Sequence, residues 1–379
     1  MTRKKSVSDY SFVDLFAGCG GLSLGMEQAG FHPIFANEIW EPAATSYRLN
    51  RGMAEDQVFL GDINYLVEHL SDFKLPKSVT MVCGGPPCQG FSMANRQRVI
   101  DDPRNHLYKV YLNFLSKTRP LFFVMENVKG MAARIDEIID NFKVALGAEY
   151  SFAHSLLNAA DFGVPQNRER FILIGNRIGV DSEKVFATIK GGKYPAFVLK
   201  DALDGLPPLG HKAQKGATEE ESDEVGYFKR SYNYEINDFY KWINQRRTVR
   251  HLYNHKNRYN NERDIEIYRR LPQGGNSLHP SIADIMPYSR RNGIFKDKYF
   301  KLEEDKVCKT ITSHMKFDCN MYIHPWYERG LTAREAARIQ TFPDGFIFYG
   351  AQNSWYGQVG NAVPVKLAKA IGEGIREWL

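Results

Sequence analysis

The first 175 residues alternate apolar runs with stretches of helical spacing, and this alternation constrains the fold more than any other feature. Runs such as LFFVM at 121–125 are apolar throughout, which is typical of strands that are covered on both faces. This pattern predicts an α/β fold with a mostly parallel, doubly wound sheet. The predicted strands are residues 11–18, 33–39, 58–63, 79–85, 121–127 and 170–176, and the helix-like stretches are 21–30, 41–50, 65–73, 107–117 and 131–147.

The alternation stops after residue 195. Residues 196–325 are rich in turn residues, charges and aromatics, and they include the acidic segment TEEESDE and the loop PQGGNSLHP at 272–280. Helical patterning returns at 331–342 and in the last 17 residues. We therefore expect one domain at 1–195, a smaller irregular domain at 196–325 and a final segment at 326–379.

Cysteine usage and hydropathy indicate where the protein works. The five cysteines are an odd number and widely scattered, which favours reduced thiols in a cytoplasm over a disulfide framework. No apolar run approaches the roughly 18 residues of a membrane span, and no apolar region follows the basic start. We expect a cytoplasmic protein. No metal site is predicted either, since the spacing of the Cys and His residues at 308, 314, 319 and 324 matches no usual zinc pattern.

Positive charge is concentrated between Lys229 and Arg270. There, 11 Lys or Arg residues stand against 5 Asp or Glu residues, an excess equal to the +6 of the whole chain. Seven Tyr or Trp side chains are interleaved with them. This composition suits a polyanion such as DNA or RNA, and a solvated surface with ordinary charge scatter is the alternative.

A glycine-rich turn, FAGCGG at 16–21, follows the first predicted strand and precedes a helix. Such a turn lets the backbone approach a ligand closely, although a tight βα turn of structural origin has the same sequence. Glu38 and Asp62 end the next two strands, at the edge where ligands of open α/β sheets lie. Glu38 is placed to accept ribose hydroxyls and Asp62 to meet an exocyclic amine. Together these residues predict an adenosine-bearing cofactor, and without a GxxxxGKS/T loop a nucleoside triphosphate is disfavoured.

One cysteine, Cys88, follows the fourth predicted strand within GGPPCQGFS at 84–92. Pro86 and Pro87 fix two φ angles near about −65°, which stiffens the backbone that carries the thiol. A free thiol has a pKa of about 8.5, so thiolate attack at neutral pH requires surroundings that lower it. We expect Cys88 to be a nucleophile at the cofactor edge, and we expect Cys83 and Cys308 to be buried and inert.

Polar residues also accompany the last two predicted strands. Glu126, in MENV, ends the fifth strand, and a partly buried carboxyl that keeps its proton could donate it to a ring nitrogen. Capping of the next turn is the alternative role. Gln166, Arg168 and Arg170 alternate in QNRER, so they are expected to face one side and to recognise an anion or a carbonyl.

The chain resembles the cytosine-C5 DNA methyltransferase family of the bacterial restriction–modification type. The resemblance covers residues 11–176 and 305–379 and rests, in chain order, on DLFAGCGG, NE, GDI, GGPPCQGFS, ENV, QNRER, RGLTAREAARIQTFPD and GNAVP. It implies a Rossmann-like S-adenosylmethionine-dependent methyltransferase domain at 1–195 and a target-recognition domain at 196–325. Residues 326–379 would supply a hinge and a C-terminal helix that returns to the catalytic domain.

The resemblance also implies roles for individual residues, with S-adenosylmethionine as cofactor and S-adenosylhomocysteine as product. Cys88 would be the nucleophile, Glu126 would contact N3 and the amino group of cytosine, and Arg168 and Arg170 would hold O2 and neighbouring groups. Contacts to DNA are implied for Gln89, Ser92, Gln166 and Thr312. The residues implied to hold the cofactor are Phe16, Ala17, Gly18, Cys19, Gly20, Gly21, Leu22, Glu38, Ile39, Asp62, Ile63, Pro86, Leu107, Asn361, Ala362 and Val363.

These residue types suit the chemistry of the reaction. Cytosine C5 is a poor nucleophile, but it becomes enamine-like when a thiolate adds at C6 while an acid supports N3. The group that adds must also leave, which favours Cys over Ser. C6 is inaccessible in a stacked duplex, so the base must swing out, and a stiffly mounted thiol suits its arrival.

The leading hypothesis is a DNA (cytosine-5)-methyltransferase that acts as a monomer on double-stranded DNA, with a cognate restriction endonuclease acting separately. Residues 229–270 and the loop at 272–280 are expected to face the DNA. An RNA cytosine methyltransferase is the second hypothesis, although GFS after Cys-Gln favours DNA over the transfer-RNA-modifying relatives. A catalytically silent DNA-binding member is the third, and the presence of Cys88, Glu126 and Arg168 argues against it.

Overall fold

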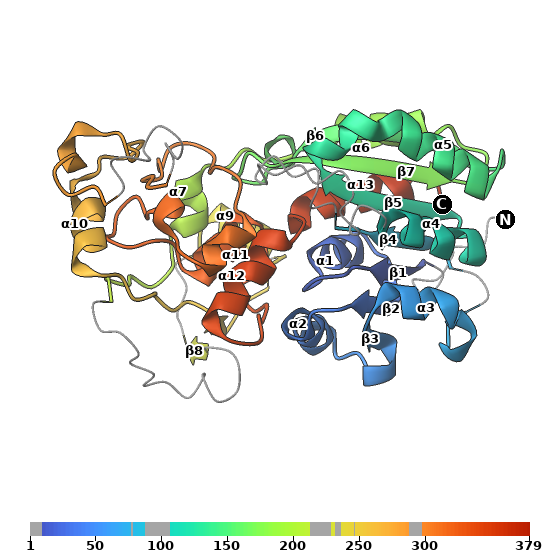
Figure 1. The fold of residues 1–379 in the computed structure, drawn as a ribbon, viewed down its shortest axis with the longest axis horizontal. Helices are drawn as coiled ribbons and strands as arrows, with labels where there is room; N and C mark the ends of the chain where they lie inside the picture. The colour runs from blue at the N-terminus through green and yellow to red at the C-terminus, as the bar shows by residue number, and fades with distance from the viewer. Residues whose placement is uncertain are drawn as a thin grey trace. The chain divides into compact units, whose positions relative to one another are not determined.

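The computed structural model describes residues 10–76, 79–87, 107–212, 229–231, 236–245, 247–287 and 298–379. The chain divides into two compact units (Figure 1). Unit 1 comprises residues 1–162, 168–195 and 363–379, and unit 2 comprises residues 163–167 and 196–362. Unit 2 thus takes in residues 326–362 as well as the segment at 196–325. In the described ranges, no helix is long and apolar enough to cross a membrane.

Unit 1 is built on a seven-stranded sheet in the order β3-β2-β1-β4-β5-β7-β6. Strands β1 to β5 are parallel, and β7 runs antiparallel to both β5 and β6. The strand order reverses between β1 and β4, which is the switch point where ligands of such sheets bind. The mostly parallel α/β fold is therefore confirmed. The strands are β1 (Ser11–Leu15), β2 (His32–Glu38), β3 (Val58–Leu60), β4 (Met81–Gly84), β5 (Phe122–Val128), β6 (Ser151–Asn158) and β7 (Glu169–Asn176).

Helices cover both faces of this sheet. On β1, Val13 and Leu15 join the core cluster that holds the apolar residues of α3, α4 and α5, whereas Asp14 points to α1 on the opposite face. Helix α13 packs against both α1 and α6, so the last helix of the chain belongs to unit 1 (Figure 1). The helices are α1 (Gly21–Gln28), α2 (Glu41–Arg51), α3 (Ile63–Glu68), α4 (Leu107–Thr118), α5 (Ile135–Leu146), α6 (Ser182–Gly191) and α13 (Val365–Arg376), with 3-10 turns at Glu55–Gln57, Leu70–Asp72, Lys129–Arg134 and Ala159–Phe162.

Unit 2 is made mainly of short helices and loops. Its one described sheet pairs β8 (Lys229–Ser231) with β9 (His251–Tyr253). A small core cluster is centred on Tyr268 and Ile323. The helices are α7 (Leu199–Leu203), α9 (Asp238–Ile243), α10 (Glu262–Arg270), α11 (Ala333–Ile339) and α12 (Gln352–Asn361), with 3-10 turns at Pro280–Ile282, Ser313–Lys316 and Asn320–Tyr322.

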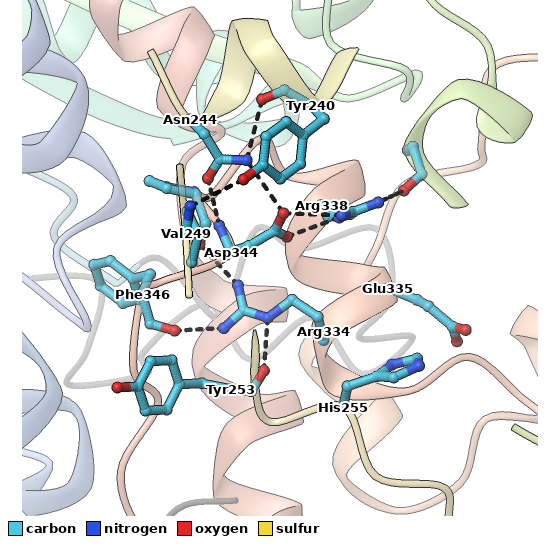
Figure 2. A network of polar contacts seen from close by, with 12 residues as sticks. Tyr240, Asn244, Val249, Tyr253, His255, Arg334, Glu335, Arg338, Asp344 and Phe346 are labelled. Atoms are coloured by element: carbon cyan, nitrogen blue, oxygen red, sulfur yellow. Dashed lines mark hydrogen bonds and ion pairs between the residues drawn. The ribbon is translucent and has the colours of Figure 1, made fainter. Parts of the chain in front are cut away.

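Helix α11 carries buried charges that organise unit 2 (Figure 2). Arg338 forms an ion pair with Asp344, with Nε 2.7 Å from Oδ1, and both side chains are at most 1% exposed. Arg334 donates to the carbonyls of Tyr253, Pro343 and Phe346. Although burial opposes ionisation, the neighbouring arginines hold the pKa of Asp344 below its usual range. Because an unpaired buried charge is costly, these contacts fix the segments they join.

Candidate active site

The turn after β1 has the tight geometry that its glycines suggested. Phe16, Gly18 and Gly20 all adopt positive φ angles of 56°, 56° and 88°. The N–H of Ala17 donates to the carbonyl of Asn37 at 2.9 Å, which ties the turn to the end of β2. A Cβ on Gly18 would have no atom within 4 Å, so the space beside this residue is open to a ligand.

Glu38, at the end of β2, holds the turn through its carboxylate. Its Oε2 accepts from the Gly18 N–H at 2.7 Å, and its Oε1 accepts from the N–H groups of Ile39 and Trp40 at 2.9 and 2.8 Å. Burial raises the pKa of Glu38, and the three N–H donors oppose that rise. Glu38, which is predicted to accept the ribose hydroxyls, therefore lies against the glycine turn.

The other implied cofactor residues of unit 1 fall into three groups. Ile39 is 70% exposed beside Glu38, and Asp62 is exposed at the start of α3, where its Oδ1 accepts from the N–H of Asn64 at 2.8 Å. Leu107 opens α4 and packs partly buried against the core. The buried members are Ala17, Cys19, Gly21, Leu22, Ile63, Pro86 and Val363.

These features fit an adenosine-bearing cofactor. A large apolar side chain, Ile39, is exposed next to a carboxylate at the carboxyl end of β2, and open space adjoins Gly18. Burial raises the pKa of the Cys19 thiol to about 12, so Cys19 is a neutral wall of the turn rather than a reactive group.

The backbone that leads to Cys88 is fixed to the end of β5. Asn127 is buried, and its Nδ2 donates to the carbonyl of Pro86 at 2.8 Å. A Cβ on Gly85 would lie 3.0 Å from Oε2 of Glu126, so the two strand ends are in close contact. Cys88, Gln89 and Ser92 themselves lie outside the described residues. Their implied roles stay predictions.

Glu126 and Arg170 form an ion pair beside this backbone. Nε of Arg170 lies 2.8 Å from Oε1 of Glu126, and each side chain is 13% exposed. The pair spans neighbouring strands, because Val128 is the residue of β5 that lies opposite Arg170 of β7. Arg168 is buried, and its N–H donates to Asn158 at 3.1 Å. The structure thus brings together the ends of β4 and β5 with Arg170.

Two residues implied to contact DNA have partners inside unit 2. Gln166 is fully buried; its Nε2 donates to Gln340 at 3.0 Å and its Oε1 accepts from the N–H of Ile311 at 2.7 Å. The hydroxyl of Thr312 lies 3.0 Å from that of Tyr322, which donates its own hydrogen to the carbonyl of Thr310. Since Tyr322 has one hydroxyl hydrogen, Thr312 must be the donor to it.

The stretch GNAVP spans the division between the units. Asn361 is exposed at the end of α12, and Ala362 is buried with its carbonyl 3.3 Å from Nε2 of Gln340, both in unit 2. Val363 belongs to unit 1. No group of three or more His, Cys, Asp or Glu residues with metal-binding geometry occurs in the part of the chain that the structure describes.

Sequence reasoning missed two residues of the site. Asn127 stands inside the ENV motif, but only its neighbour Glu126 attracted a role; its polar side chain in an apolar strand was the available signal. Arg51 lies at the end of α2 and donates to the carbonyl of Gly20 at 2.9 Å. Nothing in the local sequence distinguishes it from an exposed helix-end arginine.

Comparison with known proteins supports one family. The model of the family described as C-5 cytosine-specific DNA methylase matches residues 10–377. The chain is 33% identical over 382 residues to the type II methyltransferase M1.HphI of Haemophilus parahaemolyticus, covering 96% of this chain and 86% of that protein. It is 32% identical over 395 residues to the type II methyltransferase M.DdeI of Desulfomicrobium norvegicum, covering 96% and 88%.

A solved structure agrees in fold over nearly the whole chain. It is an E. coli prophage-encoded protein described as a DNA modification methyltransferase, with a TM-score of 0.74 and 25% identity over 97% of this chain and 98% of that one. The family uses S-adenosylmethionine as its methyl donor. From the match over residues 10–377, we conclude that the chain belongs to the C-5 cytosine-specific DNA methylase family and is a DNA (cytosine-5)-methyltransferase.

Proposed function

We propose that this protein is the modification enzyme of a type II restriction–modification system and methylates one cytosine in a specific site of double-stranded DNA. Both curated relatives described above are type II methyltransferases at 32–33% identity. We further propose that it acts in the cytoplasm, as a monomer, and separately from its endonuclease. The segment at 196–325 would recognise the target sequence.

S-adenosylmethionine would supply the methyl group, held in unit 1 by the turn at 16–22, Glu38, Ile39 and Asp62. The chain's own residues would activate the cytosine. The Cys88 thiolate would add to C6, so that the C5–C6 pair moves to C4–C5 and the C4–N3 pair moves to N3, which takes a proton from the Glu126 carboxyl. C5 would then attack the methyl group, whose bond to sulfur breaks and leaves S-adenosylhomocysteine, while N3 returns its proton to Glu126. Loss of the C5 proton to solvent would restore the C5–C6 double bond and expel the thiolate.

The observation that carries this mechanism is the contact between the ends of β4 and β5. Asn127 and Gly85 set the backbone before Cys88 directly against Glu126. A nucleophile and an acid that act on atoms of one small ring must be positioned together in this way. Arg170, paired with Glu126, would move to O2 or share the carboxylate when cytosine enters.

The described part of the basic segment narrows the region that would face DNA. Arg269 and Arg270 are paired with Glu266, Glu328 and Asp284, so their charges are already compensated. Arg247 and Arg250 are exposed, and among the described residues they have no recorded ion pair. We therefore propose that Arg247 and Arg250, in the stretch 244–250, contribute phosphate contacts in this segment.

Contacts within unit 2 fix Asn244 and Val249 on either side of Arg247 (Figure 2). Asn244 donates to Asp344 at 3.1 Å and accepts from the N–H of the same residue at 2.9 Å. Val249 donates its N–H to the hydroxyl of Tyr240 at 3.0 Å. In the loop at 272–280, Gly274 donates its N–H to the carbonyl of Lys301, and Gly275 accepts from the N–H of Lys301. These two glycines therefore pair with the backbone of their own unit. Because Asn244 and Val249 are already held in place, the arginines beside them lose less entropy when they bind phosphate.

Methyl transfer from labelled S-adenosylmethionine tests the proposal. Mixed-sequence duplex DNA and transfer RNA are offered in parallel to wild type, Cys88→Ala and Cys308→Ala. We expect 5-methylcytosine in DNA with wild type and with Cys308→Ala, whose thiol is buried in unit 2, and none with Cys88→Ala. Label in transfer RNA alone would favour the RNA enzyme, and full activity of Cys88→Ala would refute the mechanism. Bisulfite sequencing of the labelled DNA then gives the site.

A further inference from the structure

A cluster of buried polar side chains lies beneath the glycine turn in unit 1. It runs from Asp14 in β1 through Ser23 in α1 to Tyr47 and Arg51 in α2, and it ends at the carbonyl of Gly20. The mechanism above uses none of these four side chains. Their burial therefore calls for a different explanation.

Arg51 is the charged centre of this cluster. Its side chain is only 4% exposed, and Nη2 lies 2.9 Å from the Gly20 carbonyl oxygen and 2.9 Å from Oε2 of Glu27. Nη1 donates to the carbonyl of Tyr47 at 3.3 Å, and the guanidinium carbon lies 3.9 Å from the centre of the Tyr47 ring. Both terminal nitrogens of the guanidinium therefore have partners, which hold Arg51 in place, whereas its buried Nε has no hydrogen-bond partner among the described residues.

Gly20 rests directly on Arg51 and Tyr47. A Cβ at Gly20 would lie 2.5 Å from Nη1 of Arg51 and 2.7 Å from Cδ2 of Tyr47, which leaves no space beneath the turn. Gly20 is also the N-cap of α1, with a φ of 88°, and its carbonyl accepts the first helical bond from Leu24 at 2.9 Å. The bond from Arg51 therefore acts at the point where the turn becomes the helix.

The hydroxyl groups connect this contact to the sheet. Ser23 uses its one hydroxyl hydrogen to donate to Asp14. The hydroxyl of Tyr47 lies 2.7 Å from that of Ser23, so Tyr47 must donate to Ser23. Asp14 is 1% exposed. The chain of bonds joins α2 to α1 and β1, the two elements that bound the turn.

We propose that Arg51 is a positioning residue that holds the turn at residues 18–21 in the conformation that binds S-adenosylmethionine. The glycine turn is gripped from two sides: Glu38 accepts from the Gly18 N–H, and Arg51 donates to the Gly20 carbonyl. Without Arg51 the turn samples other conformations, and cofactor binding must select the competent one. The inference rests on the placement of the cofactor at this turn and concerns affinity, not methyl transfer.

The test compares Arg51→Met with Arg119→Met, a control at a more exposed arginine (34% against 4%) with the same kinds of contact. Arg119 also lies in unit 1, donates to a carbonyl at 2.8 Å (Leu146), pairs with a carboxylate (Glu149) and stacks over a tyrosine 5.2 Å away (Tyr150). Calorimetry measures the Kd of S-adenosylhomocysteine, and steady-state kinetics separate KM for S-adenosylmethionine from kcat.

We expect Arg51→Met to raise both Kd and KM about tenfold, the effect of losing one or two charge-assisted bonds, with kcat at saturating cofactor within about twofold of wild type. Arg119→Met should leave Kd and KM unchanged while lowering the thermal midpoint. Arg51→Lys keeps the charge but lacks the planar set of guanidinium donors, so its Kd should be intermediate. If Arg51→Met does not fold, Arg51→Lys takes its place in the comparison.

Two outcomes would overturn the inference. The first is a Kd for S-adenosylhomocysteine equal to that of wild type in Arg51→Met, or in Arg51→Lys if only that variant folds. The second is an equal loss of affinity in Arg119→Met, which would reflect general destabilisation. Failure of the wild-type protein itself to bind S-adenosylhomocysteine would refute the cofactor site as well. The two failures are thereby distinguished.

Discussion

The guanidinium of Arg170 and the carboxylate of Glu126 face each other across β7 and β5, with 2.8 Å between Nε and Oε1. Each side chain is 13% exposed, so the pair is largely shielded from water. In the proposed reaction Glu126 supports N3 of cytosine, and Arg170 is the group that holds this carboxylate in place before the base arrives. In this proposal the pair is preorganised for the reaction before cytosine enters.

Arg170→Gln should lower kcat/KM for DNA by about 100-fold, because the carboxylate loses the partner that orients it. The control is Lys129→Gln, which removes the neighbouring exposed pair between Lys129 and Glu169. An exposed pair contributes little, so this variant should retain wild-type activity. Equal kcat/KM values for the two variants in a methyl-transfer assay would refute the role given to Arg170.

Asn127→Ala should slow covalent capture of cytosine about tenfold, because the Pro86 carbonyl loses the bond that fixes the backbone before Cys88. The measurement is the rate of adduct formation with duplex DNA that contains 5-fluorocytosine. Asn141→Ala, which removes a bond to the hydroxyl of Tyr108 on a helix of the same unit, is the control and should not change this rate. Unaltered capture by Asn127→Ala would contradict the prediction.

Asp14 should make stability depend on pH. Burial raises its pKa to about 7, against the opposing effects of Ser23 and Arg51, whereas the unfolded chain has the ordinary value of 3.8. Between these two pH values the folded protein therefore binds more protons than the unfolded chain. The stability that protonation of Asp14 contributes is fully present below pH 3.8 and is lost as the pH rises through about 7.

Urea unfolding of wild type and Asp14→Asn at pH 4 and pH 8 tests this sign. Relative to the Asn variant, the free energy of unfolding of wild type should fall by on the order of 4 kcal/mol from the lower to the higher pH. If the free energies of unfolding of wild type and Asp14→Asn change with pH in parallel, the pKa of Asp14 does not differ between the folded and unfolded protein.

Two pairs of arginines should differ in their effect on DNA binding. The double variant Arg247→Gln/Arg250→Gln removes two exposed charges from the loop at 244–250, so the slope of log K against log salt should become shallower by about two. Arg269→Gln/Arg270→Gln removes the same charge from residues already paired within α10 and its surroundings. Its salt slope should match wild type. The opposite order of effects would place the DNA on the α10 side.

The sequence predicted the parallel part of the sheet because its strands are continuous apolar runs that can be read locally. Strand β6, by contrast, was missed: it is an edge strand with mixed burial and a polar sequence, SFAHSLLN. The antiparallel direction of β7 depends on the connection through β6 and could not be read from its residues. The shared face predicted for Gln166, Arg168 and Arg170 stays a prediction, because Gln166 belongs to unit 2 and the two arginines belong to unit 1.

Burial of charged residues was the other feature that local pattern did not reveal. Arg334, Glu335 and Arg338 have the spacing of an exposed, charged helix, yet each is at most 2% exposed. Their partners lie up to 136 residues away in sequence, as for Arg338 and the carbonyl of Ala202. Arg51 is similar, because its contact with Gly20 joins residues 31 apart. Such contacts arise from tertiary packing.

Capture of 5-fluorocytosine DNA tests the central claim most directly, since fluorine at C5 prevents release of the enzyme. Duplex containing the recognised site is incubated with wild type and S-adenosylmethionine, denatured and digested, and the modified peptide is identified by mass spectrometry. We predict a denaturation-resistant adduct in which Cys88 carries the methylated nucleotide, and no adduct with Cys88→Ala. An adduct on another residue, or methylation of ordinary DNA without any adduct, would contradict covalent catalysis by Cys88.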